Sequence, residues 1–399
     1  MPSIAEQLVQ WAHEYVPTEQ DLALSRRALQ DTVAVTLAAR RDPIRGAVGG
    51  LTDAGRWATL AHVLSFDDLH MPSTTHIGAI CVPTVLAVGG GARAYLGAAG
   101  VMARLGTVLG WSHYASGWHV TCTAGAPAAA VGAALSLGLD PRQTAAAIAL
   151  AVPAAGGVQR AFGTAGKSLQ VGFAAEAGVR AARLVASGAD ADPRALDQWL
   201  GLVGGDPARL ELSGPAVPGG LATKVFPCCY SMQRLISAAR RLPAELPVDV
   251  AIESVHVTTP EATVRPLIYD RPQTGMQGQL SLKYAIATAM LDCSPDFDSF
   301  TTAAVNRPAA QELMSRTTVE LTPGGAGLLD GDAHISARLS DGTSWSTRLE
   351  QPPGSPARPL TESDFRGKFL SCGPDVPGLL ADLDWPTAAS ILKSELPAG

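Results

Sequence analysis

The sequence predicts a mainly α-helical protein in which a smaller α+β domain interrupts a large all-helical domain. Three observations support this fold class. Ala and Gly are abundant while aromatic residues make up only 5% of the chain, which suits tightly packed helices. Helical periodicity dominates the first half of the chain and returns near its end. Strand-like alternation is confined to the region between. We therefore assign 1–225 and 354–399 to the helical domain and 226–353 to the α+β domain.

The helical domain is expected to be a bundle of buried helices. Several of its patterns are apolar on nearly all sides, and runs of small residues such as 126–138 suit close contact between helices. Glycine and proline separate the patterns. The predicted helices cover 3–15, 20–40, 54–64, 78–90, 94–110, 124–137, 141–155, 168–187 and 194–203.

The inserted domain combines helix and strand signals. Alternation of apolar and polar residues predicts strands at 248–259 and 316–323. A third alternating stretch, 332–350, contains a hairpin signal at Asp341-Gly342. Helical patterns lie at 228–241 and 280–292.

After the inserted domain, the segment 351–359 is predicted to be a linker because it is rich in Pro and Gly. A helix-start signal at 361–365 opens a helical tail. We expect this tail to pack back onto the first domain.

Charge and composition exclude several classes of partner. The formal charge of −6 and the pI near 5.8 argue against a nucleic-acid partner, which requires clustered basic charge. The most apolar helical run, Thr144 to Val158, is shorter than the ~20 residues that cross a bilayer, so no membrane partner is expected.

The cysteines and the first residues predict a cytoplasmic protein. None of the six cysteines forms a C-x-x-C pair, and adjacent Cys228 and Cys229 suit neither a zinc site nor a disulfide framework. Free thiols in a reducing compartment are the simplest interpretation. The start of the chain carries Glu6 and Glu14 and lacks the pattern of a secretory signal.

Two of the chain's five lysines, Lys167 and Lys224, stand at predicted helix starts. Lys167 follows the Gly-rich turn 163–167, and Lys224 precedes Pro227, which opens another helical pattern. A cation in a first helical turn opposes the helix dipole unless an anion lies between it and the free N–H groups. For either lysine alone, a solvated surface position is the simpler interpretation, but together they favour a small anionic ligand.

A histidine-rich segment concentrates the polar chemistry of the first half. Residues 65–78 form a short non-periodic stretch between apolar runs, and such polar groups need partners or a wet pocket. The stretch predicts an active-site loop, and the alternative is a helix-capping loop in which the aspartates are N-caps. Its candidate site residues are Asp67, Asp68, His70, Ser73 and His76.

His119 lies in a second cluster, directly before the Ala-rich helix. Histidine transfers protons near neutral pH, so His76 and His119 are candidates for an acid/base pair on opposite faces of a ligand. A buried structural histidine is an equal alternative for His119 alone. The Asp and His residues would also suit a metal ion, but no H-E-x-x-H or H-x-H spacing is present, and we predict no metal.

Five motifs, in order along the chain, resemble those of the MmgE/PrpD family, which includes 2-methylcitrate dehydratase, cis-aconitate decarboxylase and iminodisuccinate epimerase. A weaker match lies at 360–372. The five motifs are SFDDLHMPSTTHIGAICVPTVLA (65–87), GWHVTCTAG (117–125), FGTAGKSLQVGFAAEAG (162–178), KVFPCC (224–229) and RPQTGMQGQLSLKYAIA (271–287).

The resemblance implies a homodimer whose subunit has a large helical domain and an α+β lid. It implies an active site between them that uses no metal or organic cofactor and takes a small di- or tricarboxylate. Carried over by motif, the catalytic residues are His76, His119, Asp67, Asp68 and Lys167, and the substrate-binding residues are His70, Ser73, Lys224, Cys229 and Tyr284. Arg160 is a further candidate for a bidentate carboxylate contact.

The chain also departs from the pattern of the family. Ser65 stands where members usually have an aspartate, and Gln170 where they usually have a histidine. Cys122 replaces a common glycine, and the stretch before Phe66 is short. The leading hypothesis is a cofactor-independent dehydratase or decarboxylase. The alternatives are a dicarboxylate epimerase and a non-catalytic carboxylate-binding protein.

Overall fold

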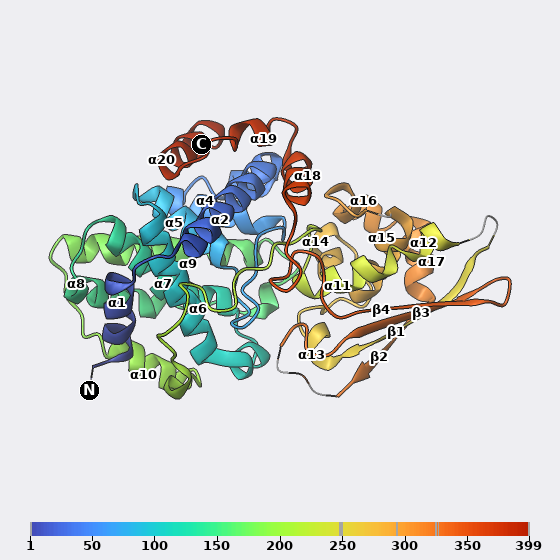
Figure 1. Ribbon diagram of the computed structural model, residues 1–399, viewed down its shortest axis with the longest axis horizontal. Coiled ribbons are helices and arrows are strands. Elements are labelled where there is room, and N and C mark those ends of the chain that lie inside the picture. Colours follow the sequence, from blue (N-terminus) through green and yellow to red (C-terminus); the bar gives the residue numbers. More distant parts are fainter. Residues whose placement is uncertain (1, 247–249, 293, 324, 326, 398–399) are drawn as a thin grey trace.

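The computed structural model describes residues 2–246, 250–292, 294–323, 325 and 327–397 (Figure 1). It confirms the predicted fold class, since most elements are helices and the strands form one small sheet. Ten helices precede the first strand-bearing region: α1 (Ile4–Glu14), α2 (Glu19–Ala38), α3 (Ile44–Ala47), α4 (Asp53–Val63), α5 (Ile77–Ala87), α6 (Ala92–Ala115), α7 (Val120–Ser136), α8 (Pro141–Ala151), α9 (Gly166–Ala186) and α10 (Ala195–Leu202).

Helix α7 lies at the centre of the helical part, which we define as α1–α10 with the tail α18–α20. Its residues from Val120 to Ala134 are all buried, because this Ala- and Gly-rich sequence is apolar on every side. Small residues allow α9 to approach closely. A Cβ at Gly178 of α9 would lie 2.4 Å from the Cβ of Ala129 in α7.

The α+β part comprises the elements from α11 to β4. Its helices are α11 (Tyr230–Ala239), α12 (Leu242–Glu245), α13 (Glu261–Val264), α14 (Gly275–Gly278), α15 (Leu282–Asp292), α16 (Thr302–Val305) and α17 (Pro308–Ser315). Its strands are β1 (Ile252–Pro260), β2 (Thr317–Thr322), β3 (Ala333–Leu339) and β4 (Ser344–Leu349).

The sheet has the order β2-β1-β3-β4, in which β1 pairs with β2 in parallel and the other pairs are antiparallel. Strand β3 alternates buried and exposed residues, so one face of the sheet is available for packing. Helices α11 and α15 contribute buried residues to the same core cluster as β1 and β3. The α+β part therefore has a core of its own, and Figure 1 shows it beside the helical part.

The tail returns to the helical part through α18 (Glu362–Cys372), α19 (Val376–Leu379) and α20 (Trp385–Glu395) (Figure 1). Lys368 of α18 is buried, with its Nζ 2.6 Å from Asp31 Oδ1 of α2 and 2.9 Å from the carbonyl oxygen of Phe66, to which it donates. The tail therefore packs against the helical part as expected, and through Lys368 it contacts the histidine-rich segment at Phe66.

Several predicted helix boundaries differ from the structure, and two of them lie near the histidine-rich segments. Helix α6 runs to Ala115, because a kink at Gly110, where φ is +68°, joins two helical stretches. Helix α7 begins directly after His119 rather than at 124. The start of the predicted strand at 248–259 and the thiol of Cys293 lie outside the described residues. Within the described ranges, no helix is both long and apolar enough to cross a membrane.

Candidate active site

Three helices begin at one cavity in the helical part. His76 precedes α5, His119 precedes α7, and Lys167 lies in the first turn of α9. Side chains bind an N–H group at two of these N-termini, the Asp68 carboxylate at Gly78 of α5 and Thr164 Oγ1 at Gly166 of α9, whereas the N-cap side chain of α7 makes no capping hydrogen bond. The cavity is lined by Ser65, Leu69, Thr74, His76, Tyr114, His119, Phe162, Lys167, Lys224, Cys229, Tyr230, Pro266, Leu280 and Leu328.

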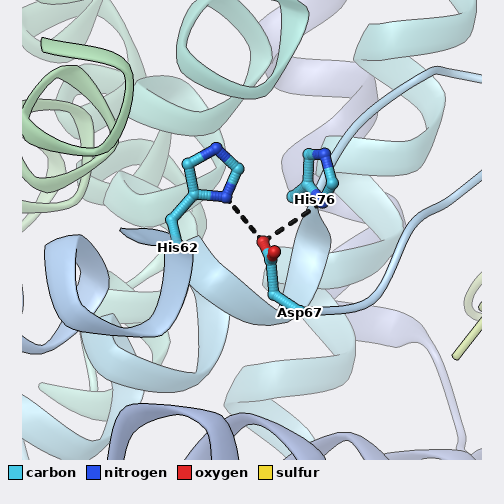
Figure 2. A group of neighbouring side chains, drawn as sticks. All are labelled: His62, Asp67 and His76. Carbon is cyan, nitrogen blue, oxygen red and sulfur yellow. Dashed lines mark hydrogen bonds and ion pairs between the residues drawn. The ribbon is translucent and has the colours of Figure 1, made fainter. Parts of the chain in front are cut away.

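The carboxylate of Asp67 lies between the rings of His62 and His76 (Figure 2) and also contacts Lys224. Its Oδ2 lies 2.6 Å from His62 Nδ1 and 3.1 Å from His76 Nδ1. Its Oδ1 accepts a hydrogen bond of 3.2 Å from Lys224 Nζ. His62 Nδ1 therefore donates to the carboxylate, whereas His76 Nδ1 donates to the carbonyl oxygen of Asp68 at 2.5 Å and only approaches the carboxylate. These contacts set the orientation of the two imidazoles.

Two lysines lie beside this network. Lys167 Nζ donates to His62 Nε2 at 2.7 Å and to Ser65 Oγ at 3.3 Å, and Lys224 Nζ also donates to the carbonyl oxygen of Ser65 at 2.9 Å. The prediction of a helix start at Lys224 was wrong. This lysine lies in an irregular segment with bends at 225–228, and α11 begins only at Tyr230.

His62 was missed as a site residue by the sequence analysis. It lies in an apolar helical pattern at the end of α4 and is fully buried, as a core histidine would be. In the structure it bridges Asp67 and Lys167 and lies 4.7 Å from His76 between ring centroids. Its position five residues before Asp67 was the only available signal.

Burial and the network determine the charges in the cavity. Burial lowers the pKa of His62 to about 3, and it also lowers the pKa values of His76 and His119, so all three rings are neutral at pH 7. Burial alone would raise the pKa of Asp67, but His62, His76 and Lys224 outweigh it and hold that pKa well below its usual value.

Lys167 lines the cavity and titrates close to neutral pH. Burial lowers its pKa to about 8, although the charge of Asp67 opposes that shift. Lys167, Lys224 and the neutral imidazoles of His76 and His119 thus line the cavity, and the Asp67 carboxylate contacts Lys224 and His76 without lining it. The net charge of these groups is positive, and the uncapped N-terminus of α7 adds to it.

Asp68, His70 and Ser73 do not line this cavity. The carboxylate of Asp68 accepts the backbone N–H of Gly78 at 3.0 Å, in the first turn of α5. The ring of His70 is 2.6 Å from Ser73 Oγ through Nδ1 and 2.6 Å from the carbonyl oxygen of Pro218 through Nε2. These side chains stabilise the loop, which is the capping alternative considered above.

Arg160 and Tyr284 are also placed elsewhere. Arg160 is exposed. Tyr284 is buried in the core of the α+β part, where its hydroxyl donates to the carbonyl oxygen of Ser299. Cys229 does line the cavity, as does its neighbour Tyr230, which the sequence analysis did not single out. Within the described part of the chain the buried Tyr230 hydroxyl has no hydrogen-bond partner.

The backbone is strained at two positions of the same loop. Ser65 and Thr74 have φ values of +51° and +56°, and they are the non-glycine residues with positive φ among those described. Both line the cavity. Strained backbone at these positions is typical of a functional site, where surrounding contacts hold it in place.

The α+β part closes the cavity. Tyr269 Oη donates to the carbonyl oxygen of Phe162 at 2.8 Å, Gln279 Nε2 donates to that of Leu64 at 3.4 Å, and Arg265 donates to that of Ala115. The remaining free volume is about 30 Å³, which holds little more than one water molecule.

His62, Asp67 and His76 also offer three ligand atoms within 4.8 Å of one another, as a metal site would (Figure 2). The donor chemistry fits a metal poorly. Each Nδ1 contacts the Asp67 carboxylate directly, and Lys224 binds the other oxygen. We therefore describe the trio as a hydrogen-bonded unit.

The family models of the MmgE/PrpD N-terminal domain and C-terminal domain match residues 52–204 and 226–379, respectively. The first match carries His62, Asp67, His76, His119 and Lys167, and the second carries the closing residues. Together the two models match most of the chain.

Curated relatives are named cis-aconitate decarboxylase. The protein from Homo sapiens is 25% identical over 301 residues, which are 69% of this chain and 59% of that protein. The protein from Mus musculus is 27% identical over 271 residues, 63% of this chain and 54% of that protein. The protein from Aspergillus terreus is 25% identical over 332 residues, 72% of this chain and 67% of that protein. The chain thus spans little more than half the length of the two mammalian relatives.

Proposed function

Because the chain belongs to the MmgE/PrpD family, we propose that it is a cofactor-independent lyase that decarboxylates or dehydrates a small di- or tricarboxylate. One observation carries the proposal. Two lysines and the uncapped N-terminus of α7 lie at a cavity whose histidines are neutral, so the cavity suits a polyanion and leaves an imidazole able to accept a proton.

Substrate carboxylates would bind Lys167 and the backbone N–H groups at the helix starts. Lys224 is neutralised in part by Asp67, whereas Lys167 has no carboxylate within ion-pair distance among the described residues. Lys167 is therefore the cation most available to the substrate. The unpartnered hydroxyl of Tyr230 would add a hydrogen bond, because burial raises its pKa and keeps it protonated.

His76 would act as the base. Its Nδ1 lies 2.5 Å from the carbonyl oxygen of Asp68 and 3.1 Å from Asp67 Oδ2, so the ring proton is on Nδ1 and the lone pair is on Nε2. Ionised Asp67 stabilises the imidazolium that forms when Nε2 takes a proton.

Lys167 would act as the acid, since a pKa of about 8 makes its ammonium a proton donor near neutral pH. In a dehydration, His76 takes the Cα proton, Lys167 gives a proton to the hydroxyl, and the C–O bond breaks to release water. In a decarboxylation the C–C bond breaks, CO₂ leaves, and the carbanion takes the proton of Lys167, which solvent replaces.

The α+β part would act as a lid. The closed cavity is far smaller than the roughly 300 Å³ or more of typical ligand pockets, so the substrate must enter before the lid closes. A homodimer and a cytoplasmic location remain predictions of this proposal. The described cysteines Cys81, Cys122, Cys228, Cys229 and Cys372 are free thiols, as such a compartment requires.

An epimerase is the second candidate. Ionisable groups from different helices, His76 before α5 and Lys167 in α9, face one cavity, as removal and return of a proton on two faces of a carbon require. Proton NMR in D₂O separates the reactions, because an epimerase exchanges the Cα proton without loss of water or CO₂.

The direct test incubates the purified protein with cis-aconitate, 2-methylcitrate, citrate and iminodisuccinate, and identifies the products by mass spectrometry. We expect loss of CO₂ or water from one of them. Ligand-induced thermal stabilisation without any product would contradict the lyase and favour the non-catalytic carboxylate-binding protein.

A further inference from the structure

We propose that Gln170 locks His119 in its neutral form with the ring proton on Nε2, so that His119 stabilises substrate charge as a hydrogen-bond donor and does not transfer protons. This inference rests on the proposed function, because it divides the roles of the two cavity histidines. It departs from the acid/base pair expected from the sequence.

The orientation of the Gln170 carboxamide is determined by a backbone peptide. Oε1 accepts the N–H of Val158 at 3.0 Å, and Nε2 lies 3.4 Å from the carbonyl oxygen of Val158. A backbone N–H only donates and a carbonyl only accepts, so a flipped carboxamide would lose both contacts. The NH₂ group must therefore be on the side of His119.

This NH₂ group fixes the tautomer of the ring. Gln170 Nε2 lies 2.6 Å from His119 Nδ1, and Cys122 Sγ lies 3.3 Å from the same nitrogen. Both neighbours are donors, because burial raises the pKa of the Cys122 thiol and keeps its proton in place. Nδ1 must then be an acceptor, and the neutral ring carries its proton on Nε2.

The backbone around this contact is tightly held. The N–H of His119 donates to the carbonyl oxygen of Gly157 at 3.0 Å, and Trp118 and Val158 form an antiparallel bridge. Gly157 has a φ of +127°, and a Cβ there would lie 2.7 Å from the Cβ of Cys122. Only glycine brings the Val158 peptide close enough to hold Gln170 against the ring.

His119 and His76 consequently present opposite groups to the cavity. Within the described residues, neither ring has a partner at Nε2, but this atom is a donor in His119 and an acceptor in His76. A neutral imidazole that gave up its only proton would become an imidazolate, which is highly unfavourable. His119 Nε2–H would therefore polarise a carboxylate or an enediolate oxygen, and proton transfer would fall to His76 and Lys167.

The tautomer is measured by ¹⁵N NMR of protein labelled at histidine, in which protonated and unprotonated ring nitrogens have distinct shifts. His119→Gln identifies the His119 signals. We expect Nδ1 unprotonated and Nε2 protonated from pH 6 to pH 8 in the wild type. In Gln170→Glu the carboxylate accepts from Nδ1, so we expect this nitrogen to become protonated. Nδ1 protonated in the wild type, or unchanged in Gln170→Glu, would overturn the proposal.

The role of His119 is tested by steady-state kinetics with the carboxylate that the protein converts. Glutamine donates a hydrogen bond but does not titrate, so His119→Gln should retain kcat within about tenfold, whereas His76→Gln should lose about 10²-fold or more. Equal losses in both variants would contradict the division of roles. Gln170→Glu should lower kcat and add an ionisation to its pH profile. Gln198→Glu, an exposed site on α10, controls for added charge and should change nothing.

Two results keep the inference separate from the proposed function. The wild-type ¹⁵N spectrum reports the tautomer whether or not any carboxylate is turned over. Gln170→Met has nearly the same length but cannot hydrogen-bond, so it shows whether a loss in Gln170→Glu reflects the tautomer or only packing. Full activity in Gln170→Met with a mixed tautomer would contradict the positioning role.

Discussion

The two walls of the cavity differ in kind. The helical part contributes His76, His119 and Lys167 to the lining, and the buried residues His62 and Asp67 contact His76 and Lys167 without lining the cavity. The α+β part contributes mainly Pro266, Leu280 and Leu328, with Cys229 and Tyr230 at its edge. The ionisable groups thus belong mainly to one wall, and the other wall is mainly apolar, so electrostatic interactions inside are less screened by water.

The largest effect is expected at His76, the proposed base on the helical wall. His76→Gln removes the Nε2 lone pair that accepts a proton, so kcat should fall by about 10²- to 10⁴-fold with the fold retained. Steady-state kinetics and circular dichroism check this. Activity close to that of wild type would place the chemistry elsewhere.

Asp67 and Asp68 form a matched pair on this wall. Asp67→Asn loses the charge that orients two imidazoles and pairs with Lys224, and should lower kcat by about 10²-fold or more. Asp68→Asn keeps an acceptor for the Gly78 N–H and should stay within about threefold of wild type. Comparable losses of kcat in both variants would show that Asp68 also contributes to the reaction.

Asp68 also predicts a dependence of stability on pH. Burial raises its pKa to about 7 from an ordinary value near 3.8, so the folded state binds this proton more tightly than the unfolded chain. The resulting stabilisation is complete below about pH 4 and is lost as the pH rises through 7. The free energy of unfolding of Asp68→Asn, measured in urea, should therefore increase relative to that of wild type between pH 4 and pH 7. A difference between the two proteins that does not change with pH would contradict this prediction.

A smaller effect is expected when Lys167 loses its charge. With a pKa of about 8, the ammonium deprotonates as the pH rises above 8, so KM for the carboxylate should increase there. In Lys167→Arg the charge persists, and the alkaline rise of KM should disappear even though kcat falls. A rise that persists in the arginine variant would point to another group.

The smallest effects are expected on the α+β wall. Tyr269→Phe removes one hydrogen bond that closes the cavity, and Tyr230→Phe removes a hydroxyl from its lining, so each should change kcat/KM by about tenfold or less. Leu321→Ala, at an exposed apolar position on β2, serves as the control. If Tyr230→Phe lowered activity as much as His76→Gln, the α+β wall would contribute to catalysis as strongly as the helical wall, which would contradict this comparison.

The sequence by itself determined the fold class, most helices and much of the site. The uninterrupted apolar pattern of α7 admits only a buried helix, and capping boxes begin α1, α2 and α8 at Ser3, Thr18 and Asp140. These signals are local, so they can be recognised without the fold. His76, His119 and Lys167 were recognisable because each stands at a helix start beside polar or Gly-rich sequence.

Only the tertiary structure decided which polar side chains meet. Asp67 and Asp68 are adjacent in sequence, but the loop, which bends at Asp67, directs one carboxylate to His62 and the other to the N–H of Gly78. His62 looked like a core residue until packing placed Lys167, 105 residues later in the chain, against its ring. Such contacts depend on how α4 and α9 pack together, which no local pattern encodes.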